Sequence, residues 1–275
     1  MSNNTEQKEL WNGSLGEGFI SFEDYIHKVV EPISRVAIAS VGAKTGDCIL
    51  DVGCGGGFTS VSFSATGASV TGVDISDKMI DQAKSKAQSI PNVSFVVADA
   101  ATEVFEKKFN HVFSHFGVMF FADPKSAFRN LRSGLTDGGK LTFVCWQDPS
   151  LNEWINLSAQ AVKSFQPVDA PPPDPRSPGG FAFADKDYIR EILEDADFSN
   201  IQIQPINKIV DMGESIEEIV HFHTKVGPLS HLLEGLDEDE QKVKAIEAVR
   251  LSVKHRMTES GLLLSAAVWL VTADG

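Results

Sequence analysis

Cysteine is scarce in this sequence, and long apolar runs are missing. The three cysteines, Cys48, Cys54 and Cys145, are too few for a disulfide framework and favour reduced thiols inside a cell. The apolar segments fall short of the roughly 20 residues that a membrane-spanning helix needs. The polar opening MSNNTEQKEL has no apolar signal core. We therefore expect a cytoplasmic protein that does not insert into a membrane.

Positive charge is also in deficit, with 24 Lys and Arg against 38 Asp and Glu and a formal net charge of −14 at pH 7. Nonspecific binding to nucleic acid depends on Lys and Arg that neutralise phosphates, and anionic membranes attract the same residues. No run of basic residues offsets this balance. The charge therefore argues against nucleic-acid and membrane partners.

The most informative stretch that is present is ILDVGCGGG at 49–57, where an apolar run ends in an acid and a glycine-rich turn follows. The small-residue segment 58–65 after it has helical potential. A strand, a glycine turn and a helix in this order bring backbone N–H groups and the positive end of a helix close to a ligand. Asp74 ends the next apolar run about 20 residues on, where a ribose-binding carboxylate is expected. The pattern predicts a nucleotide- or nucleoside-type cofactor site on a parallel sheet.

The glycine spacing separates two classes of cofactor. A dinucleotide loop follows G-x-G-x-x-G, whose third glycine permits close helix packing around a pyrophosphate. Here that third position holds the bulky Phe58. Asp51 stands just before the loop, where a carboxylate is unfavourable beside a pyrophosphate and favourable beside a cationic or zwitterionic ligand. A nicotinamide-dependent oxidoreductase is therefore the weaker alternative.

Motifs in order over residues 47–147 resemble the core of a class I S-adenosylmethionine (SAM)-dependent methyltransferase. DVGCGGG at 51–57 matches the signature E/D-x-G-x-G-x-G, Asp74 ends the second strand, and VSFVVADA ends the third. The segment FGVMFFADP at 116–124, followed by GLTDGGKLTFVCW, is similar to a bacterial subgroup related to the ubiquinone and menaquinone C-methyltransferases.

The resemblance implies SAM as cofactor and a small organic methyl acceptor, aromatic or polyketide-like, methylated at oxygen or carbon. A non-catalytic SAM-binding module is an alternative, and a homodimer is left open. Asp51 would anchor the amino-acid end of the cofactor, directly or through the loop and ordered water, or else cap a helix or turn. Asp74 would accept hydrogen bonds from both ribose hydroxyls, and Asp99 would bind the adenine amino group. The whole set expected to bind the cofactor is Asp51, Gly53, Cys54, Gly55, Gly57, Asp74, Ile75, Met79, Asp99, Ala100 and Ser114.

The methyl acceptor is expected beyond the fourth strand, around residues 114–117. Methyl transfer is an in-line displacement, so the protein must align the reactants, exclude water and, for a hydroxyl or carbon acid, remove a proton. His115 is the candidate base because the pKa of histidine suits neutral pH; a structural histidine is the alternative. Aromatic residues are expected to enclose an apolar or planar acceptor and to stabilise a sulfonium cation, namely Trp11, Phe19, Phe116, Trp146 and Phe183.

The pair His221 and His223 has the spacing H-x-H but is not expected to bind metal. Residues two apart on a helix point to different faces, and no cysteine or acid cluster supplies further ligands. We expect these histidines to be structural or to line the substrate pocket.

Alternating strand and helix patterns predict an α/β fold. We expect a doubly wound, Rossmann-like, mostly parallel seven-stranded sheet with an antiparallel last strand and helical cap insertions. The strands are expected at 48–52, 69–73, 93–98, 111–116, 140–146, 201–210 and 262–271. Ser76 and Asp123 are predicted helix caps, and Asp137-Gly138-Gly139 is a predicted turn.

The chain is expected to form one methyltransferase domain over 1–275. Residues 1–46 would form an N-terminal helical arm or cap, 47–147 the SAM-binding core, and 148–275 the rest of the sheet with a loop and a helical cap over the site. Within these parts we expect helices at 18–41, 186–196, 214–234 and 238–257 and an extended proline-rich loop at 167–184.

Overall fold

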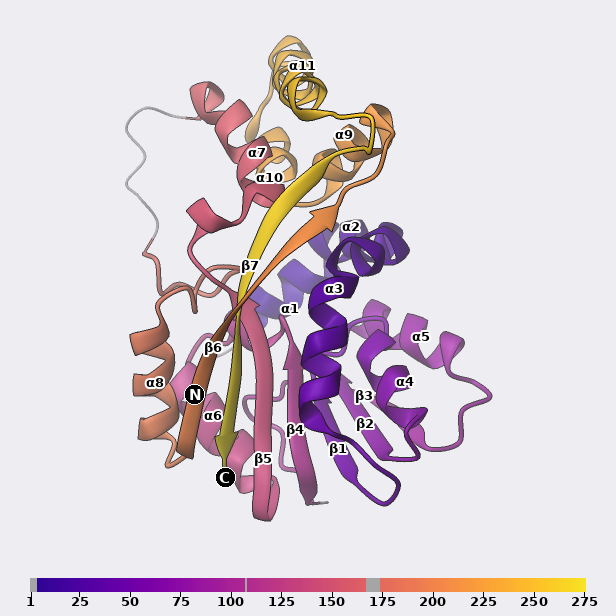
Figure 1. Ribbon diagram of the computed structural model, residues 1–275, viewed down its shortest axis with the longest axis vertical. Helices are drawn as coiled ribbons and strands as arrows, with labels where there is room; N and C mark the ends of the chain where they lie inside the picture. The colour runs from indigo at the N-terminus through magenta and orange to yellow at the C-terminus, as the bar shows by residue number, and fades with distance from the viewer. Residues whose placement is uncertain (1–3, 107, 167–173) are drawn as a thin grey trace.

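The computed structural model describes residues 4–106, 108–166 and 174–275. These residues form a seven-stranded sheet in the order β3-β2-β1-β4-β5-β7-β6, with helices on both faces (Figure 1). This confirms the predicted α/β class. The strands are β1 (Cys48–Val52), β2 (Ser69–Asp74), β3 (Val93–Val97), β4 (Phe109–His115), β5 (Leu135–Trp146), β6 (Ser199–Asp211) and β7 (Leu263–Asp274).

The first five strands are parallel, and β7 runs antiparallel to both of its neighbours, β5 and β6. Successive side chains of a strand point to opposite faces of a sheet. Accordingly, Ile49 packs in one core cluster with Phe63 and Phe113, whereas its neighbour Leu50 packs in another that includes Phe128. The middle of the sheet is therefore buried on both faces, as a doubly wound fold requires.

Helices α3 (Glu23–Val41), α4 (Phe58–Ser64) and α5 (Asp77–Lys86) cover one face, and α6 (Pro124–Ser133) and α8 (Lys186–Asp195) cover the other. The predicted cap of α5 is confirmed, because the Ser76 hydroxyl accepts a hydrogen bond from the N–H of Met79. That of α6 is also confirmed, since Asp123 accepts the N–H of Ser126. These caps fix where each helix begins relative to the strand before it.

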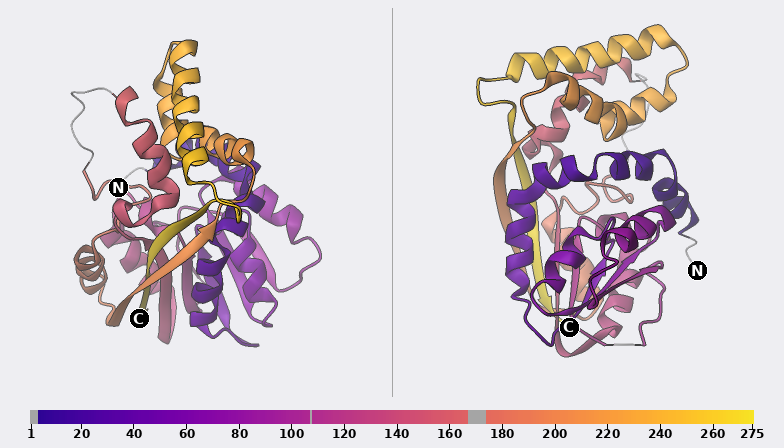
Figure 2. Two further views of the ribbon diagram at one scale, coloured as in Figure 1. Left: turned by 45° about the horizontal axis from the view of Figure 1, so that its top comes forward. Right: turned by 90° about the vertical axis from the view of Figure 1, so that its right-hand side faces the viewer.

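A group of helices stands above the carboxyl ends of the parallel strands. It consists of α7 (Glu153–Ala161) and of the helices inserted between β6 and β7, which are α9 (Ile216–Lys225), α10 (Pro228–Gly235) and α11 (Asp239–Arg256). The right-hand view of Figure 2 shows α11 across the top, with the N-terminal helices α1 (Thr5–Asn12) and α2 (Ser14–Ser21) lying beneath it. None of the described helices combines the length and apolar composition needed to span a bilayer.

Three predicted segments differ from the structure. The helix expected at 18–41 is interrupted at Phe22. The helix expected at 214–234 is broken at Gly227, which has a φ of 92° and is followed by Pro228. The predicted D-G-G turn lies inside β5, where Gly138 has a φ of 73° and the register against β4 shifts. Of the predicted loop at 167–184, residues 167–173 lie outside the described residues, and the rest forms turns and bends.

Candidate functional site

A cavity of about 410 Å³ lies at the carboxyl ends of the central strands, beneath the helical cap. Its walls come from the glycine-rich loop, the ends of β2 to β5, the helices α1 to α3, and α7. Ligand pockets in proteins measure about 300–1,000 Å³, and open α/β sheets bind ligands at this edge. The cavity therefore has the size and place of a cofactor site.

The glycine-rich loop forms one wall through backbone rather than side chains. Gly53 has a φ of 65°, and a Cβ atom there would lie 2.8 Å from the Cα of Gly117, so this position requires glycine. Gly53, Cys54 and Gly55 line the cavity. Gly57 does not, because it faces Phe95 of β3, which a Cβ atom would approach to 2.8 Å. Gly57 therefore packs the loop onto the sheet.

Asp51 lies beneath the loop and outside the cavity wall. Its side chain is completely buried, and Oδ2 accepts hydrogen bonds of 2.6 Å from the hydroxyls of both Thr59 and Ser60 in the first turn of α4. Burial raises the pKa of Asp51 to about 6. This position does not match a direct contact with a ligand. Anchoring of the cofactor through the loop and ordered water stays a prediction, and in the structure Asp51 bonds two hydroxyls of α4.

Asp74 is held so that its carboxylate lines the cavity. Oδ2 accepts the N–H of Gly55 at 2.9 Å, and Oδ1 accepts the N–H of Ser76 at 2.9 Å. Burial raises the pKa of Asp74. Each oxygen keeps a second acceptor direction, which suits a pair of vicinal hydroxyls. Ile75 and Met79 line the cavity next to it.

Asp99 stands at the next strand end and also lines the cavity, together with Ala100. Its Oδ1 accepts hydrogen bonds from the side chain of Asn4 at 3.2 Å and from the N–H of Ala101 at 3.0 Å. Its Oδ2 makes no hydrogen bond to another described residue, which leaves an acceptor for an amino group. The structure thus brings Asp74 and Asp99, predicted from separate motifs, to one cavity.

Ser114 fixes the backbone after β4 and does not line the cavity. Its hydroxyl donates to the carbonyl oxygen of Val52 at 2.8 Å and accepts the N–H of Gly117 at 3.2 Å. The intervening Phe116 has a φ of 62°, in the left-handed region that non-glycine residues rarely adopt. Such strain persists where surrounding contacts hold it and is common in functional sites.

His115 lines the cavity, and its tautomer follows from Ser34. Nε2 lies 3.1 Å from the Ser34 hydroxyl, which donates its one hydrogen to the carbonyl oxygen of Val30 at 3.1 Å. Ser34 therefore accepts Nε2–H from His115, and Nδ1 carries the lone pair. Nδ1 makes no hydrogen bond to any residue that the structure describes. Burial, together with nearby His27, lowers the pKa of His115 to about 3, so the ring is neutral at neutral pH.

Aromatic rings form another part of the cavity wall. Phe116 stacks on Trp146 with a centroid distance of 4.2 Å and an interplanar angle of 10°, and Trp154 lies 4.9 Å from Trp146. Trp11 meets Phe19 edge-on at 5.2 Å. All five side chains line the cavity.

Phe183 was predicted to line the substrate pocket, and this prediction was wrong. Its side chain is buried with Phe128 and Phe143, at centroid distances of 6.1 and 6.3 Å, and Phe181 lines the cavity in its place. The order Phe-Ala-Phe contains no signal that separates the two rings.

Sequence reasoning also missed Glu23, His27 and Trp154, which line the cavity from α3 and α7. No motif marks these residues, because their position depends on how two helices far from the glycine loop fold over it. The two histidines of the H-x-H pair separate as expected for a helix, with His221 exposed and His223 buried.

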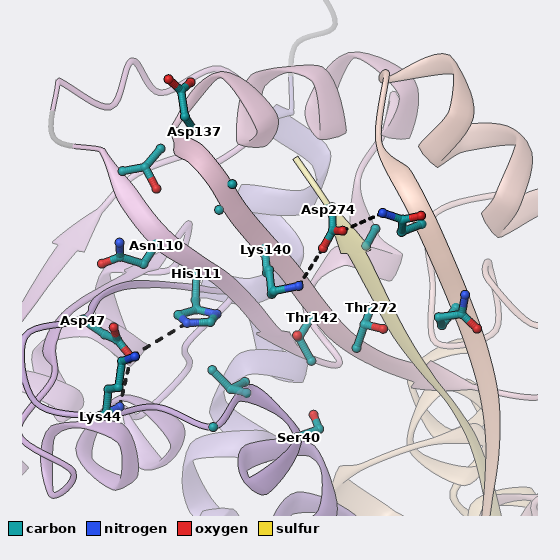
Figure 3. A pocket seen from close by; sticks show the side chains of 18 residues that line it. Ser40, Lys44, Asp47, Asn110, His111, Asp137, Lys140, Thr142, Thr272 and Asp274 are labelled. Atoms are coloured by element: carbon teal, nitrogen blue, oxygen red, sulfur yellow. Dashed lines mark hydrogen bonds and ion pairs between the residues drawn. The ribbon is translucent and has the colours of Figure 1, made fainter.

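A second, larger hollow of about 830 Å³ lies at the amino ends of the parallel strands (Figure 3). Two pairs of its titratable side chains contact each other. Lys140 contacts Asp274 at 2.7 Å, and His111 lies 3.8 Å from Asp47. The hollow is open and polar, and its position is opposite to the edge where ligands bind in such sheets.

Residues 50–143 match the family described as a methyltransferase domain. The sheet order and the glycine loop agree with this match and with the resemblance to class I SAM-dependent methyltransferases. The chain is similar to the demethylmenaquinone methyltransferase of Staphylococcus aureus (strain MRSA252), with 29% identity over 196 residues that cover 67% of this chain and 79% of that protein.

Two solved structures share the fold. One is the YcgJ protein of Bacillus subtilis, with a TM-score of 0.57, 19% identity and coverage of 88% of this chain and 97% of that one. The other is phosphoethanolamine N-methyltransferase 2 of Haemonchus contortus in complex with SAM, with a TM-score of 0.53, 18% identity and coverage of 88% and 52%.

Proposed function

We propose that this enzyme transfers a methyl group from SAM to a hydroxyl or an acidic carbon of a small, apolar, planar acceptor, with His115 as the base. One observation carries the proposal. The acceptor nitrogen Nδ1 of His115 has no partner among the described residues, and its ring lines a cavity whose walls include a glycine loop and stacked aromatic rings.

The cavity fits the cofactor group by group. Asp99 offers a free carboxylate oxygen for the adenine amino group, and Asp74 offers two oxygens for the ribose hydroxyls. The loop backbone at Gly53 and Gly55 allows a close approach of the amino-acid end. When bound, SAM supplies an electrophilic methyl group on a sulfonium centre, which the faces of nearby aromatic rings stabilise.

The residues of this chain supply alignment and proton removal. Phe116 and Trp146 present a flat apolar surface against which a planar acceptor can lie, and the cap helices exclude water from it. Ser34 holds the ring of His115 through Nε2, so that Nδ1 accepts the acceptor's proton as the methyl group is transferred. The pKa of His115 is lowered to about 3, so the ring is neutral and can accept a proton at neutral pH. It is a weak base, so proton removal must accompany methyl transfer rather than precede it.

The acceptor class follows from the walls and agrees with the relative. The cavity is lined mainly by aromatic and aliphatic side chains. The name of the Staphylococcus aureus protein denotes a methyl transfer to demethylmenaquinone. A ring of hydroquinone or phenol type suits both the stacked aromatic wall and a base that removes a proton.

The remaining parts of the proposal concern the whole chain. We propose one methyltransferase domain, because a single core cluster includes Val29 of the N-terminal part, Leu50 of the central part and Val249 of the cap. We also propose a cytoplasmic enzyme whose partner is a small molecule.

The test is transfer of a labelled methyl group from SAM to a panel of naphthohydroquinones, phenols and amines by the wild type and by His115→Ala. General-base catalysis contributes roughly 10²- to 10⁴-fold, so His115→Ala should lower kcat/KM for phenols or hydroquinones by that factor. Its affinity for S-adenosylhomocysteine should stay within about threefold of wild type, since Nδ1 is assigned to the acceptor. The matched control is His221→Ala, on the exposed side of α9. Full turnover in His115→Ala, or labelling of amines alone, would contradict the proposal.

A further inference from the structure

The first residue of α3, Glu23, is a buried carboxylate with two unequal oxygens. The residue is only 8% exposed. Oε2 accepts hydrogen bonds from Lys86 and from Gln82, both on α5. Oε1 accepts no hydrogen bond from any residue in the described part of the chain. A buried carboxylate oxygen without a donor is costly, because it loses hydration and gains nothing in return.

Oε1 is directed at the glycine-rich loop inside the cavity. A Cβ atom placed on Gly56 would collide with it, so the two are in close contact, and both residues line the cavity. Nε2 of His27 lies 3.9 Å from Oε1. That distance is too long for a hydrogen bond, and burial lowers the pKa of His27, which disfavours its charged form. The unpartnered oxygen is therefore packed against Gly56 of the loop, at the wall of the cavity.

The order of the strands indicates which part of the ligand lies there. Asp99 follows β3, Asp74 ends β2, and the glycine loop follows β1, so the three sites lie in that order along the sheet edge. If adenine lies at Asp99 and ribose at Asp74, the amino-acid end reaches the loop at Gly56. That end carries an ammonium group. Asp51 lies beneath the loop and does not line the cavity; two hydroxyls engage its Oδ2, and its Oδ1 has no hydrogen-bond partner among the described residues.

We infer that Oε1 of Glu23 accepts a hydrogen bond from the α-ammonium group of the cofactor. This inference rests on the proposed function. Glu23, which belongs to α3, then contacts both α5 and the cofactor. It contacts α5 through Lys86 and Gln82 and the cofactor through the ammonium group. Binding of the cofactor would thereby fasten the N-terminal helices over the cavity, where Trp11 and Phe19 form part of its wall.

Calorimetric titration with two ligands tests the inference. One is S-adenosylhomocysteine, and the other is its deaminated analogue, in which hydrogen replaces the α-amino group. The wild type should bind the analogue roughly 10- to 100-fold more weakly, the range for hydrogen bonds to charged groups. Glu23→Gln should bind S-adenosylhomocysteine more weakly by a similar factor and bind the analogue as well as the wild type does. Equal affinity of the wild type for both ligands would overturn the inference without any variant.

Two control variants separate ligand binding from a structural role. Glu31→Gln, an exposed position on the same helix, should leave both affinities unchanged. Lys86→Met removes the ion pair with α5 but keeps the carboxylate, so it should not reproduce the loss. An equal loss for both ligands in Glu23→Gln, or the same loss in Lys86→Met, would show that Glu23 acts only through the fold. If the wild type bound neither ligand, the proposed function would fail, whereas binding unaffected by Glu23→Gln would overturn this inference alone.

Discussion

Asp51, Asp74 and Glu23 lie near the glycine-rich loop, and each carboxylate has a different role because its hydrogen-bond partners and exposure to the cavity differ. Asp51 is enclosed and bound by two hydroxyls, Asp74 is held by backbone N–H groups with acceptor directions left over, and Glu23 keeps one free oxygen in the cavity. Burial alone would penalise each charge. Asp51 offsets that penalty through Oδ2 and lies outside the cavity, while Asp74 and Glu23 line the cavity and keep acceptors for a ligand.

Replacement of Asp74 by alanine should weaken binding of S-adenosylhomocysteine by roughly 1.5–3 kcal/mol, the range for hydrogen bonds to a charged group. The variant loses the acceptors for the ribose hydroxyls and also the hydrogen bond to Gly55 that shapes the loop. Calorimetry measures the change, with exposed Asp81→Ala on α5 as the control. Unchanged affinity in folded Asp74→Ala would refute the ribose assignment.

Residues inside short motifs could be predicted from the sequence, and residues brought in by distant helices could not. Gly53, Asp74 and Asp99 were predicted because each lies at or just after the carboxyl end of a strand that ends at the site. For Asp51 the motif gives the residue type but not the face of the strand to which the side chain points. Glu23 was missed because its contact with Lys86 spans 63 residues of sequence.

All seven strands were predicted in place, with ends that differ by up to five residues, since apolar runs and the turns between them are local signals. The insertion between β6 and β7 was predicted to be a helical cap, and the structure confirms a set of helices there. The break at Gly227-Pro228 that separates α9 from α10 was overlooked, although proline at the first position of a helix is a common start. Where the cap lies over the site depends on tertiary packing, which no local pattern encodes.

Helix α9 carries a buried histidine that should make the cap sensitive to acid. Neither ring nitrogen of His223 has a hydrogen-bond partner in the described part of the chain, and burial lowers its pKa from 6.5 to about 4. Above pH 6.5 the ring is neutral in both the folded and unfolded states. As the pH falls from 6.5 towards 4, the unfolded chain binds a proton that the folded protein does not, so stability is lost.

Urea unfolding of wild type and His223→Leu at several pH values tests this expectation. Between pH 7.5 and 4 the wild type should lose up to about 3 kcal/mol more of its unfolding free energy than the variant. The contributions of His115 and Asp51 are common to both proteins and cancel in the comparison. Parallel curves for the two proteins would show that His223 does not titrate as its burial requires.

The two ends of the parallel strands differ in their side chains, and the difference favours the carboxyl ends as the functional site. At the amino ends, Lys140 pairs with Asp274 and His111 lies near Asp47 around an open hollow (Figure 3). At the carboxyl edge, Nδ1 of His115 and Oε1 of Glu23 lack partners among the described residues, under a helical cap. The net charge of −14 keeps polyanions away from the molecule as a whole and is compatible with a cofactor that carries a positive sulfonium.

Calorimetric titration of the wild type with S-adenosylhomocysteine, with NAD and NADP titrated in parallel, tests the central claim most directly. The cavity predicts binding of S-adenosylhomocysteine alone, because Phe58 replaces the glycine that a pyrophosphate loop requires and Asp51 lies beneath that loop. Binding of a nicotinamide dinucleotide without S-adenosylhomocysteine would contradict the account.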